Sequence, residues 1–242
     1  MNNFKRSGAI IIFFALFLIT GNLKSLSQPV SITTPDELLK LRSAVEANPN
    51  DLAAHEAYIK ATGFTKREVL EDPVLEKQYE DWMKKFPASA AVPYSLGHAY
   101  ADKESPKAKP FLLKATEIDP KFDKAWFDLW IDGDRWGDFK LSASYLLKAK
   151  EADPQNADYA FYYANSFSKT DIEKYKKLSL KVAADFPNTE RGAQSLYWLA
   201  NRSDDPKEKI SYRRYFPGKR GRPCQIEHHQ CFTGIAGTGS RG

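Results

Sequence analysis

A proline returns through this chain at nearly constant spacing. The series is Pro49, Pro87, Pro120, Pro154 and Pro187, with intervals of 38, 33, 34 and 33 residues. Each proline is preceded and followed by an amphipathic stretch, and proline ends a helix because it lacks a backbone donor and clashes with the preceding turn. A fixed period of roughly 20 to 50 residues is typical of repeat proteins. The spacing therefore predicts about five helix pairs, and we find no sustained strand pattern.

The excess positive charge lies outside the repeats. The chain has 242 residues and a formal net charge of +5. Residues 1–27 and residues 218–242 each carry a net charge of +3, whereas residues 28–217 carry 29 basic and 30 acidic side chains. A nucleic-acid binder concentrates positive charge on its folded domain. We therefore expect no nucleic-acid partner.

One unit of the series combines small and large residues at fixed spacing. Its first stretch carries Pro93, Leu96, Gly97 and Tyr100, and its second carries Ala108, Leu112, Ala115 and Pro120. This pattern resembles the tetratricopeptide repeat (TPR), with proline in the usual tryptophan slot and one residue missing from the turn. The small residues let paired helices approach closely while the large ones fill the space between them.

The neighbouring units follow the same pattern with substitutions. The next unit fits at Trp126, Leu129, Leu146, Ala149 and Pro154, although Trp130 replaces the small residue and Gly133 replaces the tyrosine. A third, looser unit carries Ala160, Tyr163, Ala164, Phe167, Val182 and Pro187. The resemblance implies an all-α, TPR-like helical-hairpin solenoid over residues 36–217. The alternative, an irregular helical bundle, would make the proline spacing a coincidence.

The N-terminus is typical of a secretory signal. Lys5 and Arg6 precede an apolar run over residues 9–19, and small residues follow at Ser25 and Ser27. This arrangement predicts cleavage before Gln28, and the apolar run is too short for a bilayer span. We expect a signal peptide over residues 1–27, a linker over 28–35, and an exported, periplasmic or extracellular protein with no membrane contact after cleavage.

The resemblance also implies a binding surface, because a solenoid presents a concave face built from the first helix of each pair. The residues expected to face this groove are Tyr94, His98, Phe127, Ile131, Asp134, Arg135, Phe161, Asn165, Trp198 and Asn201. We expect a protein or peptide ligand, with Phe127 and Trp198 as apolar anchors and Arg135 as a charge partner. The alternative is that Phe127, Phe161 and Trp198 are partly core. Glu56 and Tyr94 stand where a carboxylate-binding TPR groove has lysine.

No enzyme is predicted. The body has no nucleotide-binding glycine loop, no cysteine, and only His55 and His98, so we expect no catalytic residues, no metal and no cofactor. The acidic segment 132–138 resembles a calcium loop, but Trp136 and Ala143 occupy positions where an EF-hand needs oxygen ligands. We interpret that segment as a polar turn between paired helices.

The composition changes abruptly in residues 218–242, which hold both cysteines and 6 of the 13 glycines. We expect this tail to be disordered, and codon degeneracy is consistent with a frameshift near residues 213–222. Cys224, His228, His229 and Cys231 are a weak zinc signal. A second interpretation follows from the resemblance to exported proteins in which such repeats precede a thioredoxin-like domain: a truncated redox protein without its catalytic domain. An uncapped last repeat would favour self-association.

Overall fold

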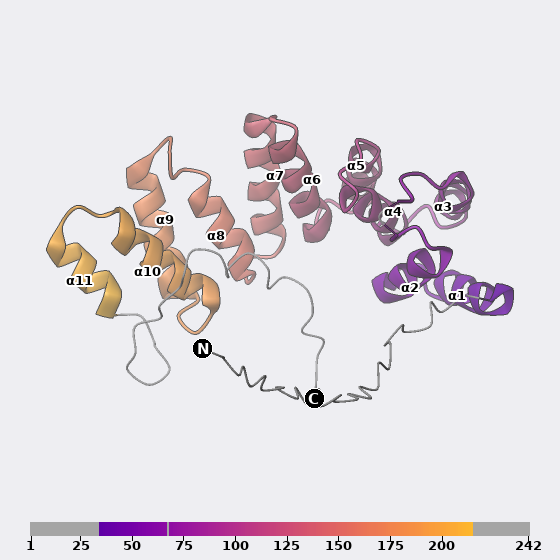
Figure 1. Cartoon of the computed structure of the whole chain (residues 1–242), viewed down its shortest axis with the longest axis horizontal. Coiled ribbons are helices and arrows are strands. Elements are labelled where there is room, and N and C mark those ends of the chain that lie inside the picture. The colour runs from indigo at the N-terminus through magenta and orange to yellow at the C-terminus, as the bar shows by residue number, and fades with distance from the viewer. Residues whose placement is uncertain (1–33, 67, 215–242) are drawn as a thin grey trace, which may run out of the picture. The chain divides into compact units, whose positions relative to one another are not determined.

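The computed structural model describes residues 34–66 and 68–214, and these ranges contain eleven helices and no strand (Figure 1). The predicted all-α class is confirmed, while the predicted signal peptide over residues 1–27 and the tail from residue 218 lie outside the described residues. None of the described helices is long and apolar enough to span a bilayer. The helices are α1 (Pro35–Ala47), α2 (Leu52–Thr62), α3 (Pro73–Lys85), α4 (Ala91–Ala101), α5 (Ala108–Ile118), α6 (Asp123–Arg135), α7 (Phe139–Ala152), α8 (Ala157–Asn165), α9 (Ile172–Asp185), α10 (Glu190–Arg202) and α11 (Pro206–Arg214).

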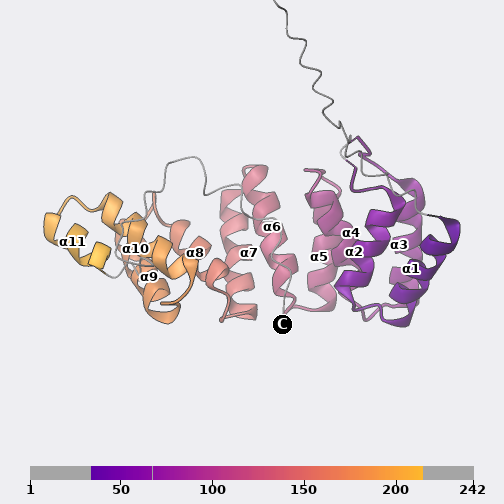
Figure 2. The same cartoon turned by 60° about the horizontal axis from the view of Figure 1, so that its bottom comes forward.

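Consecutive helices pair into hairpins, and the hairpins stack in chain order. Helix α4 packs on α5, α6 on α7, α8 on α9 and α10 on α11. The first helices of neighbouring hairpins also contact one another, α2 against α4, α4 against α6 and α8 against α10. The stacking can be followed from α1 to α11 in Figures 1 and 2. The described chain is therefore a TPR-like helical-hairpin solenoid.

The prolines of the series act as a repeated C-terminal stop. Helices α1, α3, α5, α7 and α9 each end two residues before a proline, and the residue between is the C-cap. The five C-caps have φ between −125° and −140°, and each donates its N–H to the carbonyl four residues earlier. A proline disfavours the helical conformation in the residue before it. The helices thus end where local sterics require.

Two side chains fasten the proline turns to the following helix. The Nε2 atom of His55 lies 3.0 Å from the carbonyl oxygen of Pro49, and Trp126 Nε1 donates to the carbonyl of Pro120 over 2.8 Å. Each residue stands six positions after its proline, in the slot where the TPR pattern has tryptophan. In these two units the slot residue therefore does more than fill space, because its ring N–H satisfies a turn carbonyl that no helix uses.

The hairpins approach closely at glycine, but not always at the expected position. A Cβ on Gly97 would come within 3.0 Å of Leu112, as the small-residue position predicts. In the next unit a Cβ on Gly133 would lie 3.1 Å from Ser142 Cβ, and Ser142 Oγ donates to the carbonyl of Trp130. The close contact has moved from the small-residue slot to the tyrosine slot, which leaves Trp130 free to pack toward the next hairpin.

Most of the buried apolar side chains in the described residues form two clusters. The larger extends from Val45 to Tyr159 and holds the first three hairpins together, while the smaller contains Ala160, Phe161, Ala164 and Val182. The boundary between the clusters falls within α8. The described solenoid is therefore continuous in its helix stacking but divided in its core.

Candidate functional site

A cavity of about 800 Å³ opens between α2, α4 and the connection that follows α2. Leu52, Glu56 and Ile59 recur on one face of α2, and His98 and Asp102 stand one turn apart on α4. The lining combines an apolar wall with charged groups at the rim. Its residues are Leu52, Glu56, Ile59, Phe64, Thr65, Leu70, Tyr94, Ser95, His98, Ala99, Asp102, Lys103, Glu104 and Lys124.

His98 is the polar centre of this cavity. Its ring stacks on Tyr94, with centroids 5.5 Å apart and planes at 18°, and its Nδ1 lies 2.7 Å from Oδ2 of the buried Asp128 on α6. Because a carboxylate only accepts, Nδ1 carries the proton in the neutral ring. In the neutral ring the Nε2 atom therefore carries the free lone pair, and this atom lies 4.0 Å from Oδ2 of Asp102.

The carboxylates around His98 favour its protonated form. The hydrogen bond to Asp128 raises the pKa of His98 above its ordinary value of 6.5, and the charges of Asp102 and Glu56 add to the rise. The three acids come from three helices, Glu56 from α2, Asp102 from the end of α4, and Asp128 from α6. The cavity therefore holds a histidine whose surroundings favour its protonated form.

Four of the ten predicted groove residues occupy equivalent places in successive hairpins. This groove row consists of His98, Ile131, Asn165 and Trp198, spaced by 33 or 34 residues. Ile131 and Trp198 keep 37% and 38% of their surface exposed, while Asn165 is half-buried. Asp134 and Asn201 are exposed near the ends of the same helices. The row gives the first helices a partly apolar face with the cavity toward its N-terminal end.

Three other predicted groove residues are packed into the protein instead. Tyr94 is buried under His98 and Phe122, although it still lines the cavity. Phe161 belongs to the smaller core cluster, and the guanidinium of Arg191 covers its ring. Phe127 is half-buried between α6 and α8. For Phe127 and Phe161, the structure favours the core interpretation over the role of ligand anchor.

Arg135 also differs from its predicted role. Its Nη1 donates to the carbonyl of Ala101 at the end of α4, and its Nε lies 3.9 Å from Glu104. Arg202 makes the equivalent contact two repeats later, where it donates to the carbonyl of Ser168 just beyond α8. An arginine at this place adds a charged donor to a carbonyl near the C-terminus of the preceding first helix, and that of Ala101 also accepts from the N–H of Glu104. Arg135 therefore contributes to the contact between two neighbouring hairpins.

An aromatic joint connects α6 to α8. It consists of Phe127, Trp130, Tyr159 and Tyr162, with ring centroids about 5 Å apart: 4.9 Å from Phe127 to Tyr159 and 5.0 Å from Trp130 to Tyr162. The Tyr159 hydroxyl donates to Asp123 at the start of α6 over 2.7 Å. These contacts join the two core clusters through the buried Tyr159 and three half-buried rings.

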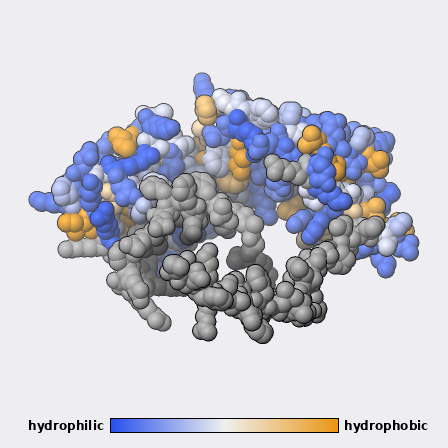
Figure 3. Space-filling view, in the orientation of Figure 1, coloured by the Kyte–Doolittle hydropathy of each residue, from blue (hydrophilic) through white to orange (hydrophobic). Residues whose placement is uncertain are grey.

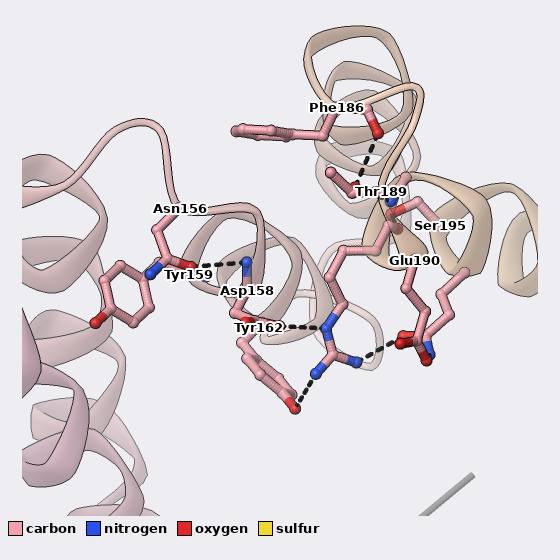
Figure 4. A network of polar contacts seen from close by, with 11 residues as sticks. Asn156, Asp158, Tyr159, Tyr162, Phe186, Thr189, Glu190 and Ser195 are labelled. Carbon is pink, nitrogen blue, oxygen red and sulfur yellow. Dashed lines mark hydrogen bonds and ion pairs between the residues drawn. The ribbon is translucent and has the colours of Figure 1, made fainter. Parts of the chain in front are cut away.

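Arg191 fastens the next junction, between α8 and α10. Its guanidinium donates to the Tyr162 hydroxyl over 2.9 Å and to Gln194, and it pairs with Asp158. Figure 4 shows Asp158 and Tyr162 of α8 facing the start of α10, where Glu190 and Thr189 lie. With both Asp158 and Tyr162 engaged, this part of the face is structural rather than open.

No sequence pattern predicted one wall of the cavity. Phe64, Thr65 and Leu70 come from the connection between α2 and α3, which is longer than the turns within the other hairpins. Figure 3 shows a mostly hydrophilic surface on the face drawn in Figure 1, with small separate apolar patches. Within the described ranges, no group of three or more His, Cys, Asp or Glu side chains is arranged to hold a metal ion. The acidic segment 132–138 was predicted as a polar turn, but only residues 136–138 lie between the helices, while residues 132–135 form the last turn of α6.

No family model matches the chain, and no curated protein matches it. Among solved structures, pilF of Pseudomonas aeruginosa is similar with a TM-score of 0.51 and 20% identity, over 76% of this chain and 84% of that chain. YrrB, described as a TPR protein with an unusual peptide-binding site, has a TM-score of 0.48 and 16% identity over 74% and 93% of the two chains. The APC/C hetero-tetramer Cut9-Hcn1 has a TM-score of 0.49 and 16% identity. The match covers 75% of this chain and 34% of that chain. The similarity to pilF is one of fold.

Proposed function

We propose that this chain is a non-catalytic scaffold that binds a peptide or protein segment along the first helices of its hairpins. The observation that carries the proposal is the cavity of about 800 Å³ on α2 and α4. Its volume lies within the range of ligand sites, roughly 300 to 1,000 Å³, and its lining combines apolar side chains with polar and charged ones. The cavity meets the groove row at His98, so one extended ligand could contact both.

The exposed part of the groove row supports a long ligand rather than a small molecule. Ile131 and Trp198 lie on α6 and α10, two hairpins apart, and both keep more than a third of their surface in water. Extended segments bind solenoids by placing side chains into successive sites along the stack. We therefore propose that the cavity holds one side chain of the ligand while Ile131 and Trp198 contact others.

The polar groups of the cavity support binding more than catalysis. His98 and Asp128 form a hydrogen-bonded pair, but a nucleophile must lie within reach of the base. Ser95 is the serine of the cavity lining, and its hydroxyl donates to the carbonyl of Ala91 in its own helix over 2.8 Å. The hydroxyl is thereby committed to the helix backbone.

Selection from a random peptide library displayed on phage tests the proposal directly. We expect the full chain to enrich related peptides, and Ile131→Ala or Trp198→Ala to weaken their binding about fivefold or more, the size expected for a contact worth about 1 kcal/mol. Ile172→Ala and Leu180→Ala are matched controls, because these exposed apolar residues lie on α9. Equal losses in all four variants, or no enriched sequence, would contradict the proposal.

A further inference from the structure

Two carboxylates of the cavity, those of Glu56 and Asp102, form no ion pair with a lysine or arginine of the described residues. Asp102 approaches the ring of His98 at 4.0 Å, and its side chain is 72% exposed. Glu56 is exposed on α2, and no ion pair within the described ranges joins it to a lysine or arginine. Glu104 of the lining lies 3.9 Å from Arg135, which is not part of the lining. The charges nearest His98 are thus acidic.

The two lysines of the lining, Lys103 and Lys124, do not pair with these carboxylates. The ammonium of Lys103 donates to the carbonyl of Lys66 over 2.8 Å and lies 4.7 Å from the ring centroid of Phe64. Lys124 lies in the first turn of α6, where it makes no ion pair in the described part of the chain. Neither lysine of the lining therefore forms an ion pair with Glu56 or Asp102 in the described part of the chain.

The walls are suited to an alkyl chain that ends in a cation. Leu52, Ile59 and Leu70 offer apolar surface for the methylene groups of a long side chain. An acidic ligand side chain would instead meet Glu56 and Asp102 with like charge.

We infer that the cavity binds a lysine or arginine side chain of an extended peptide, held between Glu56 and Asp102 with its methylene groups on the α2 wall. This inference rests on the proposed function and names the chemistry of the ligand at that site. It also implies that an apolar residue neighbours the basic one in the ligand, because Leu70 and Ile59 border the same cavity.

His98 makes this binding depend on pH. The groups that face its ring are Glu56 from α2, Tyr94 and Asp102 from α4, and Asp128 from α6, with Lys124 on the same lining. Of these residue types, histidine alone ordinarily titrates between about pH 5 and 8. Protonated His98 would place a positive charge beside the bound cation. A basic peptide should therefore bind more weakly as pH falls through the raised pKa of His98.

The peptide selection described above provides the first test. We expect enriched peptides to share a lysine or arginine beside an apolar residue, and replacement of that residue by glutamine to weaken binding about tenfold, as loss of two charge contacts would. Enrichment of peptides that need no basic residue would overturn this inference and leave the proposed function standing. Failure to enrich any peptide would overturn both.

Variants of the protein provide the second test, with a synthetic version of the enriched peptide as probe. Glu56→Gln combined with Asp102→Asn should weaken binding of the lysine peptide and leave binding of its glutamine version unchanged. Glu80→Gln on α3 is the control, because it removes one negative charge outside the cavity lining. His98→Gln should abolish the change in affinity between pH 8 and pH 6. Equal weakening of both peptides, or a pH dependence that survives in His98→Gln, would contradict the inference. Circular dichroism of each variant checks that the fold is kept.

Discussion

At the residue scale, the two histidines of the described ranges respond to opposite surroundings. His55 is fully buried, with Nδ1 2.9 Å from the Tyr79 hydroxyl and Nε2 on the Pro49 carbonyl, and burial lowers its pKa below 6.5. Because a carbonyl only accepts, Nε2 donates and Nδ1 accepts from tyrosine. The hydrogen bond to Asp128 instead raises the pKa of His98. The slot residue is a neutral structural group, and the groove residue can gain a charge.

The signs of these two shifts predict opposite effects of pH on stability. The unfolded chain protonates His55 near pH 6.5 while the folded chain resists, so its contribution is present above that pH and lost as pH falls. The contribution of His98 is complete below pH 6.5 and lost as pH rises through its raised pKa.

Titration of the ring signals by NMR measures the two shifts directly. We expect the His98 signal to titrate above pH 6.5 and the His55 signal to titrate below it, with assignment by His98→Gln and His55→Gln. A midpoint for His98 below 6.5 would show that Asp128 does not hold the ring as described. His55→Ala should lower the free energy of unfolding by about 3 kcal/mol, because it creates a cavity and leaves the Tyr79 hydroxyl unpaired.

At the element scale, glycine sets how closely neighbouring helices and turns can approach. Gly192 lies in the first turn of α10, and a Cβ there would come within 2.1 Å of the carbonyl oxygen of Phe186. Gly97 is less severe, because its hypothetical Cβ would meet Leu112 at 3.0 Å. Backbone cannot move aside as a side chain can. The turn before α10 therefore depends on one residue that the repeat pattern did not mark.

Alanine substitutions should rank these positions. We expect Gly97→Ala to destabilise the protein by about 1 to 3 kcal/mol through overpacking, and Gly192→Ala to destabilise it more. Gly137→Ala is the control without a clash: nothing lies within 4 Å of its Cβ position, and its φ of +80° costs roughly 1 to 2 kcal/mol. Urea unfolding followed by circular dichroism gives the three values. A milder effect at Gly192 than at Gly137 would contradict the close approach.

At the scale of the whole molecule, the division of the core predicts uneven stability. The hairpins up to α7 share the larger cluster, whereas α8 and α9 form the smaller one, and the aromatic joint connects them. Solenoid stability is approximately a sum of repeat and nearest-neighbour terms. A weak neighbour term at one junction lets the two sides unfold separately.

Phe127→Ala should separate the two parts. It removes the ring contacts to Trp130 and Tyr159, with an expected loss of about 2 kcal/mol for a half-buried phenylalanine. Hydrogen exchange should then become faster in α8–α11 than in α4–α7, and unfolding should show two steps. Phe139→Ala is the control, since that ring is 65% exposed. Uniform acceleration over all described helices would mean that the joint is not a boundary.

Much of the architecture could be predicted because it depends on local constraints. Proline restricts the residue before it, so Pro87 or Pro154 ends a helix wherever the segment lies in the fold. The 33- and 34-residue intervals then place the groove row from His98 to Trp198 on equivalent helices. These features act within a few residues or through a period, and both can be read directly from the amino-acid order.

Tertiary structure decided which of those residues are available to a ligand. Arg135 contacts the Ala101 carbonyl 34 positions away, and Phe161 lies beneath Arg191, although both stand at predicted groove positions. The pair of His98 with Asp128, and the wall that Phe64 contributes, likewise join segments about 30 residues apart. The sequence by itself determined the helices, their ends and their order. Packing determined the cavity, because exposure depends on which distant side chain reaches a position first.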